Sequence, residues 1–91
     1  MHTDEYEISL SRELEVCIKK VNALKKNLSR MEIKFNMTTE EFIVRFHHGE
    51  IPEDNKDFTT WMNDLHALRK WQSSMQQYEE LFYFMKIGQG F

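Results

Sequence analysis

The fold is decided by residues 9–35, which read SLSRELEVCIKKVNALKKNLSRMEIKF. The apolar residues of this stretch follow one another at alternating steps of four and three. They are Leu10, Leu14, Cys17, Val21, Leu24, Leu28, Met31 and Phe35. A repeat of about 3.5 residues is typical of a helix that pairs with another helix along one apolar seam. The stretch therefore predicts a coiled-coil-like helix over residues 9–35, and we expect Asn36 to end it in a left-handed conformation.

A second, shorter helix is predicted over residues 38–48. Thr38 and Glu41 have the spacing of a capping box, in which each residue's side chain accepts a hydrogen bond from the other's backbone N–H. Gly49 is expected to end this helix. Thr39 is the first helical position, where proline is usually accepted, so we expect proline to be tolerated there.

A long third helix is predicted over residues 56–86, because Pro52 and the Asp54-Asn55 pair break the chain and supply an N-cap. Its apolar residues recur at steps of three or four. They are Phe58, Trp61, Leu65, Leu68, Trp71, Met75, Tyr78, Phe82 and Met85. Because the first and third helices have similar lengths, we expect an antiparallel helical hairpin, with the short helix capping its closed end.

Together these elements predict an all-α fold in which residues 1–91 form a single domain. Residues 1–8 are expected to lead into the first helix, and residues 87–91 to form a flexible tail after the third. In an antiparallel pair, Cys17 should lie against residues 71–78 of the third helix.

The composition bounds the functions that such a chain can have. Its 91 residues are 41% hydrophobic and 30% charged, with a net charge of −3 and a single cysteine. A chain this short has little room for a deep catalytic cleft, so we expect a binding module and not an enzyme. The lone cysteine excludes an internal disulfide and favours the cytoplasm. Neither a leader peptide nor an apolar run of about 18 residues is present, so secretion and membrane insertion are not expected.

The histidine and cysteine side chains form no recognisable catalytic or metal-binding pattern. His47 and His48 end the second helix, where a cation faces the negative end of the helix dipole, and His66 lies on the third helix. Aspartates lie near them in the sequence, but no HExxH motif is present. Cys17 occupies a seam position, where cysteine behaves as a small hydrophobic residue. We therefore expect no metal, no cofactor and no catalytic residue.

The chain holds more large aromatic side chains than two helices can bury between them. Phe, Trp and Tyr make up 13% of the residues, and residues 81–85 read LFYFM. Five consecutive apolar residues point in all directions around a helix, so we expect this end to be buried on every side and the protein to bind a second chain. The predicted partner-binding residues are Trp71, Tyr78, Phe82, Tyr83, Phe84 and Met85. The alternative is that the N-terminal segment, with Tyr6, Ile8 and Leu10, covers this end.

The middle of the chain carries a recognisable succession of motifs, with MTTEEFIVRF, HHGE and DFTTWMNDLHAL following one another over residues 37–68. Its key positions are Met37, Glu40, Glu41, Phe42, Arg45, Phe46, Gly49, Glu50, Asp57, Phe58 and Trp61. This pattern resembles a family of small bacterial two-helix proteins that are encoded beside small toxin genes and act as their antitoxins. The sequence departs from the family pattern at Ile51-Pro52 and at His66. The resemblance implies an inhibitor that binds a partner protein and has no chemistry of its own.

The sequence leaves three functions open. The first is an antitoxin-like inhibitor, and the acidic second part of the chain suits a basic toxin as its partner. The second is a helical scaffold or adaptor that associates with itself, for example as a homodimer. The third is nucleic-acid binding through the lysines and arginines of residues 12–34, which the pI near 5.8 disfavours.

Overall fold

The computed structural model describes residues 5–52 and 54–89, with residues 86–89 described by their backbone. It consists of three α-helices, which are α1 (Glu5–Phe35), α2 (Thr39–His47) and α3 (Lys56–Gln89). No strand occurs within these ranges. The all-α fold predicted from the sequence is confirmed.

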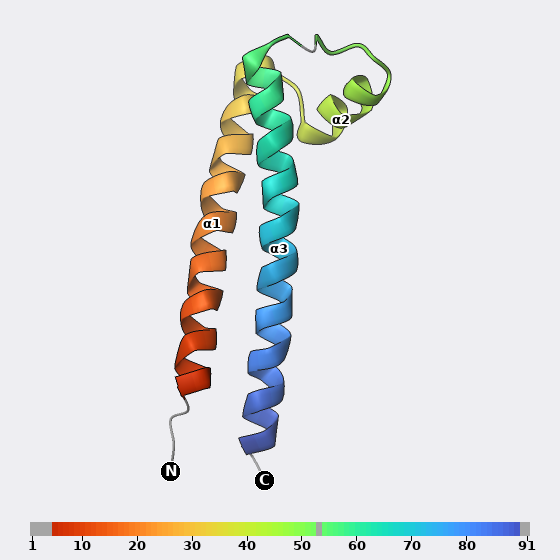
Figure 1. Cartoon of the computed structure of the whole chain (residues 1–91). Coiled ribbons are helices and arrows are strands. Elements are labelled where there is room, and N and C mark those ends of the chain that lie inside the picture. Colours follow the sequence, from red (N-terminus) through yellow and green to blue (C-terminus); the bar gives the residue numbers. More distant parts are fainter. Residues whose placement is uncertain (1–4, 53, 90–91) are drawn as a thin grey trace.

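The two long helices, α1 and α3, lie side by side and run in opposite directions (Figure 1). The start of α1 and the end of α3 therefore lie together, at what we name the open end. The other end, where α2 lies beside the first turns of α3, is the closed end (Figure 1). The molecule measures 58 × 19 × 19 Å. A rod this thin gives each long helix one long neighbour, so much of each helix faces solvent.

The apolar seam predicted for α1 is the side of the helix that is shielded from solvent. Leu10, Cys17, Val21 and Leu28 are buried, and the other four seam residues are half-buried. The helix begins at Glu5, earlier than the predicted start at residue 9, so residues 5–8 are helical. Glu5 and Glu7 lie in the first turn, where the positive end of the helix dipole stabilises carboxylates.

Helices α1 and α2 end in the same way. The chain leaves α1 through Asn36, with φ of 50°, and leaves α2 through Gly49, with φ of 71°. In each case the next N–H donates to a carbonyl oxygen five residues back. These bonds join Met37 to Glu32 at 3.1 Å and Glu50 to Arg45 at 2.9 Å. This is the Schellman arrangement, which needs a left-handed residue, and it confirms both predicted helix ends.

The N-cap predicted for α2 is also confirmed. The Thr38 hydroxyl oxygen accepts a hydrogen bond from the Glu41 N–H at 3.1 Å. The helix itself spans Thr39–His47, one residue shorter at each end than the predicted 38–48, because Thr38 and His48 are its capping residues.

Helix α3 starts as predicted and runs further than predicted. The Asn55 side-chain oxygen accepts a hydrogen bond from the Asp57 N–H at 2.9 Å, which caps the first turn. The helix continues to Gln89. The flexible tail expected over residues 87–91 is therefore wrong for residues 87–89, which are helical, and residues 90 and 91 lie outside the described residues.

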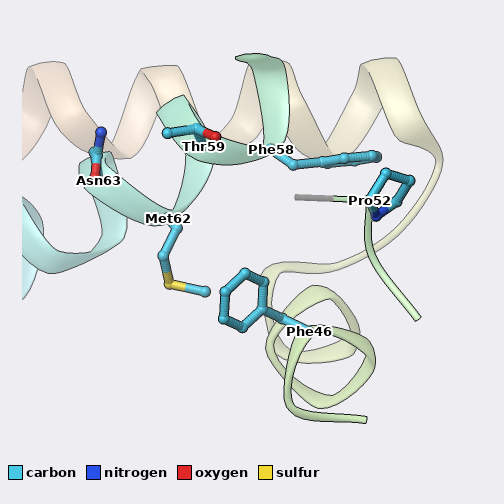
Figure 2. Close-up of a pocket in the computed structure, with 6 residues that line it drawn as sticks. All are labelled: Phe46, Pro52, Phe58, Thr59, Met62 and Asn63. Carbon is cyan, nitrogen blue, oxygen red and sulfur yellow. The ribbon is translucent and has the colours of Figure 1, made fainter. Parts of the chain in front are cut away.

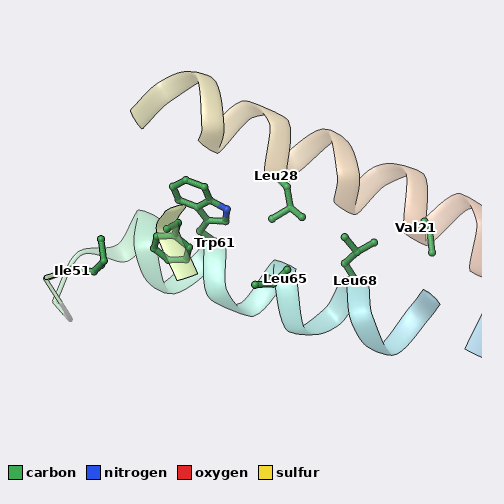
Figure 3. Close-up of a cluster of buried hydrophobic side chains, with 7 residues drawn as sticks. Val21, Leu28, Ile51, Trp61, Leu65 and Leu68 are labelled. Atoms are coloured by element: carbon green, nitrogen blue, oxygen red, sulfur yellow. The ribbon is translucent and has the colours of Figure 1, made fainter. Parts of the chain in front are cut away.

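A stack of aromatic rings fills the closed end. The Phe42 ring of α2 lies flat on the Trp61 ring of α3, with centroids 4.1 Å apart and an interplanar angle of 2°. Both side chains are fully buried. Phe35 and Phe58 extend the stack, with 4.6 Å between their centroids. Along the helix pair the core continues through Val21, Leu28, Leu65 and Leu68 (Figure 3).

Two polar contacts at Thr39 join all three helices. The Thr39 N–H donates to a carboxylate oxygen of Glu32 on α1 at 2.7 Å. The Trp61 indole N–H of α3 donates to the Thr39 hydroxyl oxygen at 3.3 Å. Proline at this position would remove the N–H and the hydroxyl, so the structure contradicts the expectation that proline is tolerated there.

Phe42 is predicted to dominate the attachment of α2. Phe42→Ala should lower the free energy of unfolding by about 3–5 kcal/mol, because it leaves a cavity against Trp61. Urea denaturation followed by tryptophan fluorescence measures this loss. The control is Val44→Ala on the exposed side of the same helix, which should change stability by less than about 0.5 kcal/mol. Equal losses for the two variants would contradict the stacked arrangement.

Thr39→Pro is predicted to destabilise the protein by more than the loss of an ordinary cap. The bond to the Glu32 carboxylate is charge-assisted, so its removal should cost about 1.5–3 kcal/mol, against about 1 kcal/mol for Thr38→Ala. Thr39→Ser keeps both contacts and should remain near wild type. Chemical denaturation of the three variants tests the order, and a wild-type stability for Thr39→Pro would rule out the contact with Glu32.

Candidate protein-binding surfaces

The open end of α3 exposes side chains that the sequence predicts to be buried on every side. Leu81, Tyr83 and Phe84 are 43%, 63% and 66% exposed, while Phe82 and Met85 are half-buried. One chain therefore leaves part of this end uncovered, as expected for a helix with a single neighbour, and its burial by a second chain stays a prediction. The physical reason is that α1 is the helix that lies along this part of α3, and one neighbouring helix covers one side (Figure 1).

Phe82 is the residue of this group that faces α1. Its ring lines an open hollow of about 270 Å³ together with residues from the first turns of α1, which are Glu7, Ile8, Ser11 and Arg12. The alternative in which the N-terminal residues cover this end therefore holds for Phe82. It is wrong for Tyr83 and Phe84, and Tyr6, which was expected to help cover them, is itself exposed.

Tyr83 and Phe84 are the most exposed of the six predicted partner-binding residues, and we name them the open-end aromatic surface. Their rings meet edge to face, with centroids 6.1 Å apart. Adjacent helical residues point about 100° apart, so the two rings extend over different sides of α3. Trp71 and Tyr78 are half-buried, and Trp71 also packs against the core. The structure therefore divides the predicted site into an exposed part and a half-buried part.

A second surface, which sequence reasoning missed, lies on the outer side of α2. Val44 is exposed there and shares an open hollow of about 400 Å³ with Arg45 and three glutamates, which are Glu40, Glu41 and Glu50. Among the described residues none of these three carboxylates forms an ion pair. Glutamates are common in a first helical turn because of the helix dipole, so their presence alone does not indicate a binding surface. The signal in the sequence is the apolar Val44 beside them.

A smaller apolar pocket of about 180 Å³ lies between α2 and the start of α3. It is lined by Phe46, Pro52, Phe58, Thr59, Met62 and Asn63. Figure 2 shows the Phe46 ring pointing toward the end of the Met62 side chain, with Pro52 beside Phe58 at the other side of the pocket. Phe46 is on the same side of α2 as the buried Phe42, because residues four apart on a helix share a face.

Cys17 is a core residue, as the seam predicts. It is 1% exposed, and this burial, followed by the nearby Glu13 carboxylate, raises the pKa of its thiol. Phe35 of α1 meets Phe58 of α3. Because the helices are antiparallel and rise equally per residue, the position eighteen residues before Phe35 is level with the position eighteen residues after Phe58. Cys17 is therefore level with residue 76, within the predicted range 71–78.

The three histidines among the described residues, His47, His48 and His66, lie at the surface. His47 is the last residue of α2, and the His48 N–H donates to the Val44 carbonyl oxygen at 3.1 Å as part of the helix end. His66 is exposed on α3. Across the described residues, no group of three or more His, Cys, Asp or Glu side chains is placed to hold a metal ion. Among the described helices, none has the length and apolar character needed to cross a membrane.

Comparison with protein families, with curated proteins and with solved structures finds no match to this chain.

Cys17 is predicted to be protected from thiol reagents in the folded protein. Iodoacetamide should alkylate it at least about 100-fold more slowly in buffer than in urea, because the reagent reaches it only when the helices separate. The raised pKa means that the unfolded chain loses its thiol proton first as the pH rises above the usual value near 9.0. Stability should therefore fall as the pH rises beyond that value. Fast alkylation in buffer would contradict the burial of Cys17.

Proposed function

We propose that this protein is a non-enzymatic binding module that inhibits a small partner protein, as the antitoxins that it resembles do. In this proposal it acts in the bacterial cytoplasm, without a cofactor, and its partner is toxin-like. The observation that carries the proposal is the exposure of Tyr83 and Phe84 at the open end. Exposed aromatic rings are costly to leave in water, and binding energy at protein interfaces is concentrated in such side chains.

The charge of the chain supports a basic partner. Residues 37–91 contain four more acidic than basic residues, and α2 presents Glu40, Glu41 and Glu50 around the exposed Val44. Complementary charge accelerates association and disfavours wrong partners. In the proposal this acidic surface steers a basic partner toward the molecule, and the open-end aromatic surface supplies most of the affinity.

The positions of the residues that could carry chemistry support a binding role over a catalytic one. Cys17 is buried with a raised pKa, which is the opposite of what a nucleophilic thiolate needs. His48 serves the end of α2 through its backbone. Inhibition by binding requires neither a nucleophile nor a base, and it needs a surface of the kind that Tyr83 and Phe84 provide.

Tyr83→Ala and Phe84→Ala are each predicted to weaken the complex with the product of the neighbouring gene by more than about 1 kcal/mol. Helicity should stay unchanged, because both side chains extend into solvent. Titration calorimetry measures the affinity and circular dichroism the helicity. In cells, each variant should protect less well than wild type against expression of that gene product.

The matched control is Ile33→Ala, which removes an apolar side chain that is 82% exposed in the last turn of α1, far from the open end. This variant should bind as tightly as wild type. Association with a basic partner should also slow as salt is added, because screening weakens steering. A neighbouring gene product that neither binds nor is inhibited, or equal losses for Ile33→Ala and Tyr83→Ala, would overturn the proposal.

A further inference from the structure

The half of α3 nearer the open end carries two apolar seams. The first faces α1 and consists of Leu68, Met75 and Phe82, which are seven residues apart. The second, which we name the second seam, follows steps of three, four, three and four residues. It consists of four large apolar or aromatic residues, Trp71, Tyr78, Leu81 and Met85, together with the small polar residue Ser74. At about 100° per residue, the centre of the second seam lies roughly 80° around the helix from the centre of the first. A helix with two adjacent seams has the surface to contact two neighbouring helices.

One edge of the second seam is covered by α1, and its other edge faces solvent. Leu81 is exposed, and the other four residues are half-buried. The helix that lies along this part of α3 is α1 (Figure 1). The seam extends over fifteen residues, or about 22 Å of helix, which is enough for a second helix to pack along it.

The surface area of the chain indicates how much a partner would have to cover. The chain exposes 7005 Å². A compact monomer of 11.1 kDa exposes about 5,700 Å², so this rod exposes about 1,300 Å² more. A stable interface of standard size buries about 800 Å² on each partner. Pairing with one further chain along the second seam is therefore enough to remove most of this excess.

We infer that the second seam binds the second seam of another copy of this chain, with the two α3 helices antiparallel and Tyr78 at the two-fold axis. In this arrangement Ser74 lies opposite Leu81 of the partner subunit, and Trp71 lies opposite Met85 of the partner subunit. Each small or flat side chain meets a long one, as close packing requires. A parallel pair would instead place the two Ser74 residues opposite each other and leave a void.

The charges favour the same antiparallel arrangement. Glu79 and Glu80 point roughly 120° or more away from the centre of the second seam, so no acidic pair faces its counterpart. The acidic surfaces of α2, at the two closed ends, are separated by roughly 40 Å or more in the antiparallel dimer. This is several times the Debye length of about 8 Å. A parallel dimer would bring these like charges level with each other.

The dimer does not depend on the proposed inhibition of a partner protein. Tyr83 points to the side of α3 roughly opposite the second seam, and Phe84 points about 100° away from the centre of this seam. Two copies would therefore present two open-end aromatic surfaces. Binding of a partner protein and binding of a second copy of this chain can therefore be tested with separate variants.

Sedimentation velocity of the full chain, with Ser74→Glu and Ser73→Glu as a matched pair, tests this inference. Ser73 is exposed on the far side of the helix, while Ser74 is a half-buried member of the second seam. Wild type should sediment as a dimer. Ser74→Glu should raise the dissociation constant by more than about 100-fold, because it places two unpaired carboxylates in the interface. Ser73→Glu should change the constant by less than about threefold, and both variants should keep wild-type helicity.

Disulfide trapping tests the direction of the helices. In a Cys17→Ala chain that has been checked for dimer formation, Tyr78→Cys should form a covalent dimer on oxidation. Ser74→Cys should not, because its two copies are about 12 Å apart along the axis and a disulfide needs Cα atoms within about 7 Å. A wild-type monomer at all micromolar concentrations, a dimer that Ser74→Glu leaves intact, or equal trapping at positions 74 and 78 would each overturn the inference. Binding of a different protein by a monomeric wild-type chain would also overturn it, while supporting the proposed function.

Discussion

The stacking of Phe42 on Trp61 is the interaction on which the arrangement of the three helices depends. A helix of nine residues is too short to persist in water by itself, so α2 exists because its side chains are held by the rest of the protein. Phe42 supplies the buried area, and the ring beneath it belongs to α3. The Trp61 indole N–H then fixes the rotation of α2 through Thr39, whose own N–H is bonded to Glu32 of α1. One contact region therefore positions three elements.

The same region determines the register of α1 relative to α3. Phe35 lies against both Phe58 and Trp61, with centroids 4.6 and 5.9 Å away. Nearby, the Lys34 ammonium and the Asp57 carboxylate form an ion pair at 2.7 Å. Both of its side chains are well exposed, and exposed pairs contribute about 1 kcal/mol or less. The buried rings therefore determine the register of the two long helices, and the ion pair follows from it.

The features that the sequence predicts correctly are those decided by neighbouring residues along the chain. The seam from Leu10 to Phe35 requires only helical periodicity, and the ends at Asn36 and Gly49 require only a residue that tolerates positive φ. The sequence does not predict that α3 continues through Gly88, because the glycines of residues 86–91 favour a flexible tail. Within a helix, however, a glycine costs only about 1 kcal/mol, so it weakens the helix without ending it.

The features that the sequence does not predict depend on which elements meet in space. The place of Thr39 in α2 alone predicts that proline is tolerated there, whereas the Thr39 N–H donates to Glu32 of α1. The apolar character of residues 81–85 predicts that one neighbouring helix cannot cover them all, whereas which of them α1 covers depends on how the two helices are placed. Likewise the acidic hollow around Val44 is formed by α2 together with Glu50 beyond its end, so it has no periodic signature in the chain.

The distribution of the core connects the fold to the two binding proposals. The contiguous cluster of buried side chains extends from Ile51 at the closed end to Val21 and Leu68. Beyond it, toward the open end, the buried side chains among the described residues are Leu10 and Cys17. The open half nevertheless holds Trp71, Tyr78 and the aromatics of residues 82–84. Burial of large aromatic side chains is a main source of stability for a chain this small, and in the open half a single chain provides that burial only in part. An antiparallel dimer would give each open half the second helical neighbour that α2 and its ring stack already supply, in part, to the closed half.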